Sequence, residues 1–384
     1  MKIVIAPDKF KGNMTAPEVC ETVKKAFLRR LPDAEIVTLP MADGGEGTVD
    51  AVISAMAGEL RSVSVHGPLG DKVTAKFGTF RGSGGHLTGV MEMASASGLA
   101  LLPPGKRDIL HATTFGTGEV IRALLDLDVT EIVIGIGGSA TNDGGAGMAQ
   151  ALSFRLLDRE GRELPPGGGA LVRLDRIDAS QADERLSSVR FRVACDVTNP
   201  LLGPDGATAV YGPQKGGNSV TLPVLEEGLT NLARVWKQSG MVENVTEEGD
   251  GAAGGLGAGL RAFCHAEKVS GARLVMDLLG YEKHLEDADL VVLGEGCTDS
   301  QTASGKICAE AAKVARKHHV PVLLLSGALL GEPEEFEESF DCALSTSTGG
   351  HLDMAETIKA GKRDLYFTAL NLASLIRLFK KEKK

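Results

Sequence analysis

The sequence predicts an α/β protein in which one parallel α/β domain is interrupted by a second, mixed α/β domain. Strand-like apolar runs alternate with helical patterns near both ends of the chain, as they do in βαβ units with parallel strands. Between these regions, polar and apolar residues alternate, which is typical of antiparallel strands. The chain has 384 residues, whereas a single hydrophobic core rarely grows beyond about 250–300 residues. Two domains are therefore expected.

Two βα units are expected at the beginning of the chain. Strand, helix, strand and helix follow one another over residues 2–7, 15–30, 35–39 and 49–57. Acidic residues come directly after both strands: Asp8 in the stretch DKFKG, and Asp43 and Glu46 in the stretch MADGGEG. Ligands of parallel α/β sheets bind beyond the carboxyl ends of the strands. Both stretches are therefore candidate sites.

The middle of the chain predicts a mixed sheet. A hairpin or meander is expected from residue 63 to residue 79, where a Gly-Pro-Leu-Gly turn interrupts the alternation. Residues 154–169 are rich in glycine, proline and polar side chains, and we expect a surface excursion there. Further strands are expected over residues 86–93, 132–136 and 190–194, and helices over residues 114–127, 222–240 and 251–263.

The βα rhythm returns at the end of the chain. Strands are expected over residues 289–293, 321–325 and 342–345, with a helix over residues 305–319 and amphipathic helices after the last strand. We therefore divide the chain into a discontinuous parallel domain, residues 1–64 plus 284–384, and an inserted mixed domain, residues 65–283. The active site is expected in the cleft between them. A division into two continuous domains is the alternative.

The composition favours a small polar substrate. The net charge is −10 at pH 7 and aromatic residues make up 4%, which argues against nucleic acid, since that ligand selects basic surfaces and stacking side chains. No apolar run reaches the length of a membrane span, so no membrane partner is expected. The six cysteines are scattered without a CxxC pair, which is typical of reduced thiols in a cytoplasmic protein and gives no cysteine metal site.

The stretch EIVIGIGGSATNDGGAG, residues 131–147, is the strongest candidate for binding an anion. A buried strand runs into a loop of glycines and small polar residues, whose backbone N–H groups can surround a phosphate group. The candidate phosphate-binding residues are Gly137, Gly138, Ser139, Thr141, Asn142, Gly144 and Gly145. Asp143 would repel a bare phosphate, but it could hold Mg²⁺ or accept a proton. The alternative is a glycine-rich turn that packs against a helix.

Two later strands also end at acidic residues. Asp196 and Asn199 follow one strand, and Glu295 and Asp299 follow another. Phosphoryl transfer uses such groups: carboxylates for Mg²⁺, a carboxylate base for an alcohol, and lysines for the transferred charge. Each of these acidic residues and lysines also has a simpler, structural explanation. An aspartate after a strand often caps a helix, and a single lysine is usually solvated. The sequence has no Walker, GxSxG or HExxH pattern, and no GxGxxG follows the first strand.

Five stretches in order resemble the glycerate kinase family of bacterial glycerate and glucarate catabolism: APDKFKG, MADGGEGTVDA, GIGGSATNDGGAGMAQALSF, CDVTNPLLGPDGA with YGPQKGG, and GEGCTDSQTASGK. The resemblance spans residues 3–350. It implies transfer of the γ-phosphate of ATP, with Mg²⁺, to a hydroxyl of D-glycerate, and a flavodoxin-like domain with an inserted second domain. The expected product is 2-phosphoglycerate, with 3-phosphoglycerate as the alternative. Cys297 stands where the family commonly has Arg or Lys.

The resemblance and the strand ends together give the expected roles. Asp196 or Asp8 is the candidate general base, while Lys11 and Lys215 would neutralise transferred charge. The candidate Mg²⁺ ligands are Asp43, Glu46 and Asp143. The candidate glycerate-binding residues are Asn199, Glu295, Asp299 and Ser300.

Other classes of function stay open. One is a catalytically inactive sensor that binds glycerate or nucleotide and signals to a partner. Acids at several strand ends favour the enzyme, because a pure anion sensor gains nothing from carboxylates that face its ligand. A phosphatase or mutase acting on phosphoglycerates is a further alternative, which would not need ATP. The sequence also leaves the oligomeric state open, with a homodimer among the options.

Overall fold

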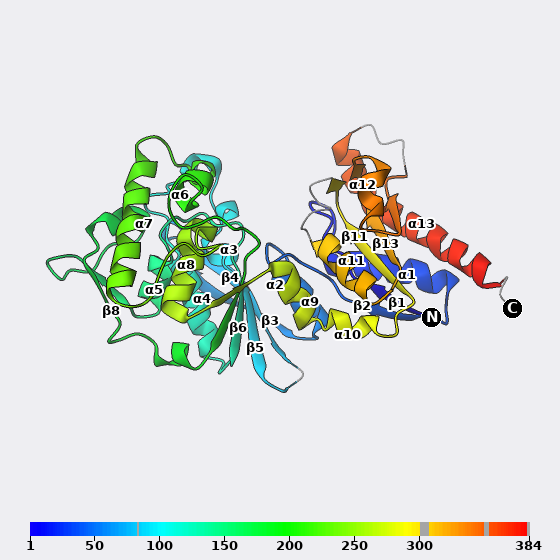
Figure 1. Ribbon diagram of the computed structural model, residues 1–384, viewed down its shortest axis with the longest axis horizontal. Coiled ribbons are helices and arrows are strands. Elements are labelled where there is room, and N and C mark those ends of the chain that lie inside the picture. Colours follow the sequence, from blue (N-terminus) through cyan, green and yellow to red (C-terminus); the bar gives the residue numbers. More distant parts are fainter. Residues whose placement is uncertain (83, 300–306, 349–352, 382–384) are drawn as a thin grey trace. The chain divides into compact units, whose positions relative to one another are not determined.

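The computed structural model describes residues 1–82, 84–299, 307–348 and 353–381, and the chain divides into two compact units (Figure 1). Unit 1 comprises Met1–Asp43, Asp50–Ala57 and Ala272–Lys384, and unit 2 comprises Gly44–Val49 and Gly58–Gly271. The predicted fold class is confirmed: a parallel α/β unit is interrupted by a mixed α/β unit. No helix in the described part of the chain is long and apolar enough to span a bilayer.

Unit 1 is built on a five-stranded parallel sheet in the order β15-β13-β11-β1-β2. The strands are β1 (Lys2–Ile5), β2 (Glu35–Thr38), β11 (Leu290–Glu295), β13 (Val322–Ser326) and β15 (Cys342–Ser345). Numbered along the chain within this sheet, the order is 2-1-3-4-5, which is the flavodoxin-like order. The order reverses between β1 and β11, and this is the point at which ligands of such sheets bind.

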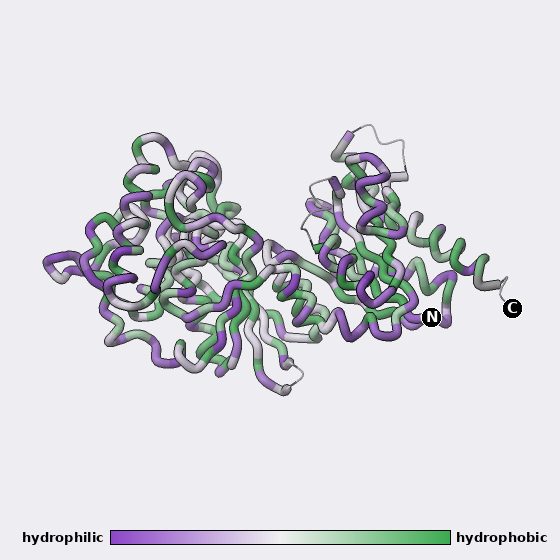
Figure 2. Tube along the Cα trace, in the orientation of Figure 1, coloured by the Kyte–Doolittle hydropathy of each residue, from purple (hydrophilic) through white to green (hydrophobic). Residues whose placement is uncertain are grey.

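The helices of unit 1 pack on a core of aliphatic residues. The helices are α1 (Ala16–Arg30), α2 (Thr48–Ala55), α9 (Gly271–Leu278), α10 (Tyr281–Leu285), α11 (Ile307–Lys317), α12 (Pro333–Glu337) and α13 (Met354–Lys381). Two short strands, β12 (Thr298–Asp299) and β14 (Leu329–Leu330), pair with each other. Thr15 and Glu18 form the capping box of α1, which satisfies N–H groups at the start of that helix. Hydrophobic and hydrophilic residues alternate along α13 (Figure 2), and its Leu365, Ala369 and Ala373 are fully buried in the same core as Phe27.

Unit 2 is built on a six-stranded mixed sheet in the order β10-β9-β6-β5-β4-β3. The strands are β3 (Glu59–His66), β4 (Lys72–Arg81), β5 (Leu87–Glu92), β6 (Glu131–Gly135), β9 (Arg190–Ala194) and β10 (Glu267–Val269). Strands β5, β6, β9 and β10 run parallel to one another. Strand β4 pairs antiparallel with β5, and β3 pairs antiparallel with β4. The whole of β3 pairs with β4, so the structural boundary precedes this strand, whereas the sequence-based division cut it at residue 64.

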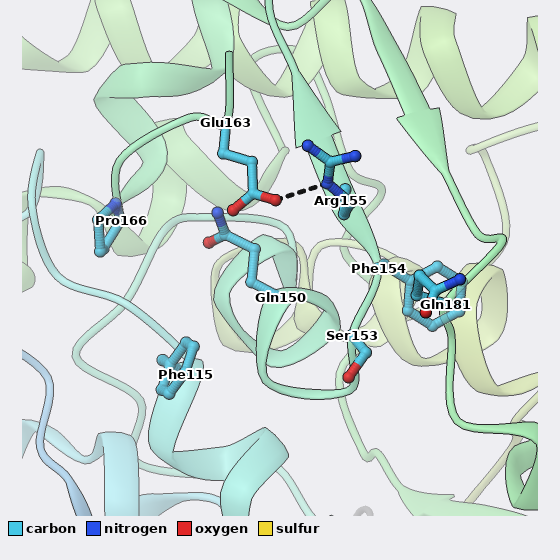
Figure 3. Close-up of a pocket in the computed structure, with 8 residues that line it drawn as sticks. All are labelled: Phe115, Gln150, Ser153, Phe154, Arg155, Glu163, Pro166 and Gln181. Carbon is cyan, nitrogen blue, oxygen red and sulfur yellow. Dashed lines mark hydrogen bonds and ion pairs between the residues drawn. The ribbon is translucent and has the colours of Figure 1, made fainter. Parts of the chain in front are cut away.

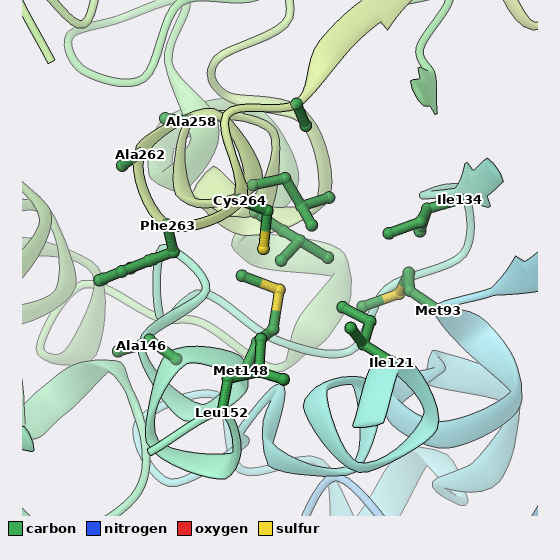
Figure 4. Close-up of a cluster of buried hydrophobic side chains, with 14 of the residues drawn as sticks. Met93, Ile121, Ile134, Ala146, Met148, Leu152, Ala258, Ala262, Phe263 and Cys264 are labelled. Carbon is green, nitrogen blue, oxygen red and sulfur yellow. The ribbon is translucent and has the colours of Figure 1, made fainter. Parts of the chain in front are cut away.

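The helices of unit 2 enclose the larger hydrophobic core. They are α3 (Ala94–Ser97), α4 (Phe115–Leu125), α5 (Ala146–Ala151), α6 (Ala207–Tyr211), α7 (Thr221–Gln238) and α8 (Ala252–Cys264). Met148 of α5 lies among Cys264, Ile121 and Leu152 (Figure 4), all of them buried. Aromatic packing of Trp236 against Phe263 adds to this core.

One segment differs from its sequence-based expectation. Residues 154–169 were expected as a surface excursion, but β7 (Arg155–Leu157) pairs there with β8 (Arg176–Asp178). Leu156 and Leu157 are buried in unit 2. The glycine and proline content of the segment therefore belongs to the turn after β7, while its few apolar residues join the core.

Candidate active site

The anion-binding candidate is the loop of residues 136–145, which joins β6 to α5 in unit 2. Gly137 and Gly138 are exposed, and Ser139 is 7% exposed. Gly138 has a φ of +75°, a conformation that favours glycine. The remaining candidates, Thr141, Asn142, Gly144 and Gly145, are buried. The loop thus has an exposed tip, Gly137 and Gly138, and a buried base, residues 139–145.

Asp143 organises the buried base of the loop. Its Oδ2 accepts hydrogen bonds from Thr114 N (2.8 Å), Thr114 Oγ1 (2.9 Å) and Gly147 N (3.2 Å), and its Oδ1 accepts one from Gly145 N (3.2 Å). Thr114 Oγ1 also accepts a hydrogen bond from Met148 N at 2.9 Å. Burial raises the pKa of Asp143 above its ordinary value, and these hydrogen bonds limit the rise. Because the carboxylate is engaged inside the loop, the geometry favours a positioning role over the Mg²⁺ ligation expected from the sequence.

Glycines at the base of the loop are explained by close packing against α8. Gly144 N donates to Gly254 O at 3.0 Å. A Cβ atom at Gly254 would lie 2.0 Å from Thr141 O, and Gly254 has a φ of +68°. The alternative of a glycine-rich turn packed against a helix therefore applies to the base, whereas the exposed tip has no such packing need.

Lys215 lies beneath the exposed tip. The short helical turn Pro213–Lys215 follows α6, and the lysine side chain is only 2% exposed. Its Nζ donates hydrogen bonds to Ser139 Oγ (2.8 Å) and Thr141 O (2.7 Å). Burial lowers the pKa of Lys215 to about 7, although the nearby Asp143 charge opposes this. The Lys215 side chain is therefore held against the loop by hydrogen bonds and is not solvated.

Two polar atoms at the base of the loop are buried without a hydrogen-bond partner among the described residues. They are Thr141 Oγ1 and Asn142 Oδ1. Asn142 Nδ2 donates to Thr208 Oγ1 at 3.1 Å, which anchors the loop to α6. The unsatisfied atoms leave spare hydrogen-bonding capacity next to Lys215.

The segment Gly44–Val49 crosses the carboxyl ends of three neighbouring strands of unit 2. A Cβ at Gly44, which has a φ of +82°, would lie 2.3 Å from Ala194 Cβ at the end of β9. A Cβ at Gly135, the last residue of β6, would lie 2.2 Å from Gly44 O. Val49 N donates to Glu92 Oε1 at the end of β5, at 2.9 Å. The exposed Glu46 is therefore carried to the same edge as the loop tip, and the exposed Asp43 immediately precedes this segment.

Asp196 and Asn199 follow β9, the strand next to β6. Asp196 is exposed, and its Oδ1 accepts a hydrogen bond from Gly271 N (2.8 Å). It thus holds the residue at which α9 begins. The Asn199 amide donates to Asp205 O (2.8 Å) and accepts from the Tyr211 hydroxyl (2.6 Å). Asn199 therefore shapes the loop that it lies in, and Asp196 is the more exposed of the two residues.

The candidates in unit 1 gather where the strand order reverses. Asp8 N donates to Gly294 O at 2.8 Å, so the ends of β1 and β11 lie together. Glu295 is 5% exposed and accepts a hydrogen bond from Thr298 Oγ1 at 2.8 Å. A Cβ at Gly296 would lie 3.1 Å from Lys11 N. The backbone of the exposed Lys11 therefore lies close to Gly296, the residue before Cys297.

Asp299 is half-buried in β12. Ser300 lies outside the residues that the structure describes. Within the described residues, no group of three or more His, Cys, Asp or Glu side chains forms a metal site. Mg²⁺ needs no such cage, because it is usually held by one or two carboxylates together with substrate phosphates.

Sequence reasoning missed Thr114 and Glu92. Thr114 precedes the glycine-rich start of α4 and is fully buried, but no local pattern indicates that its partner is Asp143, 29 residues away. Glu92 ends β5, a position at which other acids were noticed, so the strand-end rule would have found it.

A separate pocket in unit 2 contains none of the predicted site residues. Its volume is about 340 Å³, and it lies at the end of α5 away from the loop (Figure 3). It is lined by Phe115, Gln150, Ser153, Phe154, Arg155, Glu163, Pro166 and Gln181. Arg155 Nε pairs with Glu163 Oε1 at 2.7 Å, and Gln150 Nε2 donates to Leu164 O at 2.9 Å. Because these polar groups already bind one another, we do not assign this pocket to the active site.

The Thr114–Asp143 contact gives a first testable prediction. Thr114→Val keeps the shape of the side chain but removes two hydrogen bonds of its hydroxyl. We expect the free energy of unfolding to fall by about 1–3 kcal/mol, and the KM for nucleotide to rise because the loop loses its anchor. Thr117→Val is the matched control, since it removes a buried hydroxyl of α4 that is bonded to Ser97 of α3. Equal KM values in the two variants would contradict a positioning role for Thr114.

Comparison with known proteins identifies the family. The model of the glycerate kinase family matches residues 3–377. A glycerate kinase from Halalkalibacterium halodurans is 45% identical over 97% of both chains, and a glycerate 2-kinase from Escherichia coli K12 is 49% identical over 86% of both chains. A solved structure from Salmonella typhimurium LT2, assigned as a glycerate kinase 2, has a TM-score of 0.90 and 43% identity over 99% of both chains. The resemblance found in the sequence is confirmed: the chain belongs to the glycerate kinase family and is a kinase.

Proposed function

We propose that the protein transfers the γ-phosphoryl group of ATP to the 2-hydroxyl of D-glycerate and releases 2-phosphoglycerate. A kinase of this family takes its phosphoryl group from ATP, and the similar Escherichia coli protein is a glycerate 2-kinase. The structural observation that carries the proposal is the buried Lys215 beneath the exposed tip of the loop. A cation and adjacent backbone N–H groups form the environment that phosphoryl transfer requires.

The loop tip is proposed to bind the nucleotide phosphates. The backbone N–H groups of Gly137 and Gly138 lie at its exposed surface, and glycines let an anion approach closely. Ser139 Oγ accepts a hydrogen bond from Lys215 Nζ, so its own O–H is directed elsewhere and can donate to a phosphate oxygen. Thr141, Asn142, Gly144 and Gly145 would support this tip from its buried base.

Asp196 is the general base that we favour. It follows β9, which pairs with the strand that leads into the loop, and its carboxylate is exposed. Asp8 is half-buried and its Oδ1 accepts a hydrogen bond from Lys9 N (2.7 Å), so we keep it as the second choice. Lys11 is proposed to neutralise transferred charge together with Lys215. The residues proposed to bind glycerate are Asn199, Glu295, Asp299 and Ser300.

Asp43 and Glu46 are proposed to bind Mg²⁺, directly or through water. Both carboxylates are exposed, and they flank the turn of Gly44 and Gly45. The chemistry that Mg²⁺ would supply there is neutralisation of phosphate charge. This donor set fits Mg²⁺, which is commonly held by one or two carboxylates plus substrate phosphates.

A metal titration tests this assignment. In Asp43→Ala, we expect the Mg²⁺ concentration for half-maximal activity to rise by about 10- to 100-fold, as for carboxylates that orient bound metals. Asp33→Ala is the control, because Asp33 is exposed at the other end of β2. A normal Mg²⁺ requirement in Asp43→Ala would remove this residue from the metal site.

The reaction itself is tested by incubating the purified protein with Mg·ATP and D-glycerate and resolving the products by ³¹P NMR. We expect 2-phosphoglycerate with the D-acid only, and no product in samples with L-glycerate or without glycerate. Formation of 3-phosphoglycerate would overturn the regiochemistry but keep the kinase. Absence of both products from a folded protein that binds glycerate would support the inactive sensor.

We also propose that the reaction takes place in the cytoplasm. All six cysteines are free thiols, and a reducing compartment keeps such thiols unpaired.

A further inference from the structure

A buried aspartate outside the proposed site joins two cationic side chains in unit 2. The Asp250 carboxylate is fully buried, whereas Arg261 and Lys268 are 17% and 11% exposed. Lys268 Nζ donates to Asp250 Oδ1 (2.7 Å), and Arg261 donates to Oδ2 (2.8 Å) and Oδ1 (3.3 Å). Glu247 N also donates to this carboxylate at 3.2 Å. The Asp250 carboxylate therefore accepts hydrogen bonds from two cationic side chains and from one backbone N–H group.

The turn that carries Asp250 lies against the loop that carries Asp196. Gly251 N donates to Asn199 O at 2.9 Å. A Cβ at Gly249 would lie 2.6 Å from Cys195 Sγ, so the turn and the loop are in direct contact. One side of the Asp196 loop thus rests on the turn of residues 247–251.

A second support of the Asp196 loop is formed by β10 and the residues after it. Lys268 lies on β10 opposite Val193 of β9. Cys195 N donates to Val269 O (2.9 Å), and Gly271 N donates to Asp196 Oδ1 (2.8 Å). Lys268 therefore connects the two supports of the loop, because it lies on β10 and its Nζ binds both Asp250 and Glu248 O (2.7 Å).

Stability alone gives little reason for this arrangement. Transferring a carboxylate and an ammonium from water to the interior carries a large free-energy penalty for each ion, and apolar residues of similar volume often stabilise a protein equally well. A buried ion pair with fixed hydrogen-bond directions does, however, set the relative position of the elements that it joins.

We propose that Asp250, Lys268 and Arg261 form a positioning frame that holds the Asp196 carboxylate in place for proton transfer. This inference rests on the proposed function, in which Asp196 accepts the glycerate proton. The frame residues do not touch the substrate. They act by fixing the two supports of the loop, since a shift of about 1 Å in a reacting group can cost as much as 100-fold in rate.

The test is Lys268→Met, which keeps the length of the side chain but removes its hydrogen bonds to Asp250 and Glu248. We expect kcat to fall by about 10- to 100-fold, while the KM for ATP stays within about twofold because the phosphate loop is unchanged. Lys268→Arg should recover most of the activity. Arg190→Met is the matched control, since Arg190 pairs with Glu267 at the amino-terminal end of the same two strands. A loss of kcat in Arg190→Met equal to that in Lys268→Met would contradict the frame.

A double-mutant cycle separates positioning from general loss of structure. In an Asp196→Asn background, Lys268→Met should have almost no further effect on kcat, because the group that it positions is no longer a base. Multiplication of the two separate losses would overturn the proposal. If Lys268→Met does not fold, as judged by thermal unfolding, Asp250→Asn tests the same frame with a side chain of the same shape.

Failure of the proposed function gives a different result. Without phosphoglycerate formation by the unmodified protein, the kinase proposal fails before any variant is compared. If Asp196→Asn keeps full activity, Asp196 is not the base and the frame has no catalytic purpose. By contrast, a base-deficient Asp196→Asn combined with a normal kcat in Lys268→Met overturns the frame and leaves the proposed function intact.

Discussion

Asp196→Asn is expected to lower kcat by about 10²- to 10⁴-fold, the contribution of a well-placed general base. Asparagine cannot accept the proton of the glycerate hydroxyl. Its amide oxygen can still accept the hydrogen bond from Gly271 N that Asp196 Oδ1 now accepts, so the loop should keep its geometry. The measurement is the steady-state rate at saturating ATP and glycerate, with thermal unfolding to confirm that the variant is folded.

Asp205→Asn is the control for this substitution. Asp205 is exposed in the same connection between β9 and α6, and only its backbone carbonyl is used, as the acceptor for Asn199. Its activity should be unchanged. A loss of less than tenfold in Asp196→Asn would transfer the role of base to Asp8, and Asp8→Asn would then show the larger loss.

Lys215→Met is expected to lower kcat by about 10²- to 10³-fold, the range measured when one donor to a developing negative charge is removed. Methionine fills much of the volume of the buried side chain but cannot donate to Ser139 Oγ or Thr141 O. Lys237→Met is the control, because Lys237 is exposed on α7. Normal turnover in Lys215→Met would exclude the lysine from phosphoryl transfer.

The pH dependence of Lys215 provides an independent check. Its pKa is lowered from 10.5 to about 7 by burial. Between these two pH values the unfolded chain holds a proton that the folded chain lacks, so this group makes the free energy of unfolding rise as pH increases from about 7 towards 10.5. Below about pH 7 both states are protonated and the contribution is constant. The stability of the unmodified protein should therefore increase relative to Lys215→Met between pH 7 and 9.

Catalysis should respond in the opposite direction. The ammonium form of Lys215 is needed to bind phosphate, so kcat/KM for ATP should decrease as pH rises through about 7. Bound phosphate favours the charged form and raises the pKa of Lys215. The decrease in kcat should therefore occur at higher pH than the decrease in kcat/KM. Coinciding profiles would show that the lysine does not face the bound phosphate.

The architecture could be predicted from the sequence because its signals are local. Apolar runs such as Ile132–Ile134 predict buried strands, and changes between alternation and helical spacing mark the inserted unit. The boundary between the two units, after residue 57, was harder to predict from the sequence. The first part of β3, from Glu59, belongs to unit 2 only because it pairs with residues of β4, and pairing is not visible in a single strand.

Candidate site residues could be named from the sequence, but the burial and hydrogen bonding of their side chains could not. A strand end identified Asp143 and the family resemblance identified Lys215, yet both are buried among partners that lie far away in the sequence. Lys215 meets Thr141 across 74 residues, and Asp143 meets Thr114 across 29. A sequence pattern records which groups are present, whereas the surroundings of each group determine its charge and role.

The discontinuous sheet of unit 1 has a consequence for biosynthesis. Ile3 of β1 pairs with Leu290 of β11, so the first two strands leave the ribosome long before their central neighbour exists. At about 5–20 residues per second, this interval lasts on the order of 15–60 seconds, during which one edge of β1 has no partner. Gly58–Gly271 of unit 2 is contiguous and can fold in that time. The nascent amino-terminal segment is therefore the part of this chain most in need of a chaperone, and carboxy-terminal truncation should cause aggregation through exposed β1.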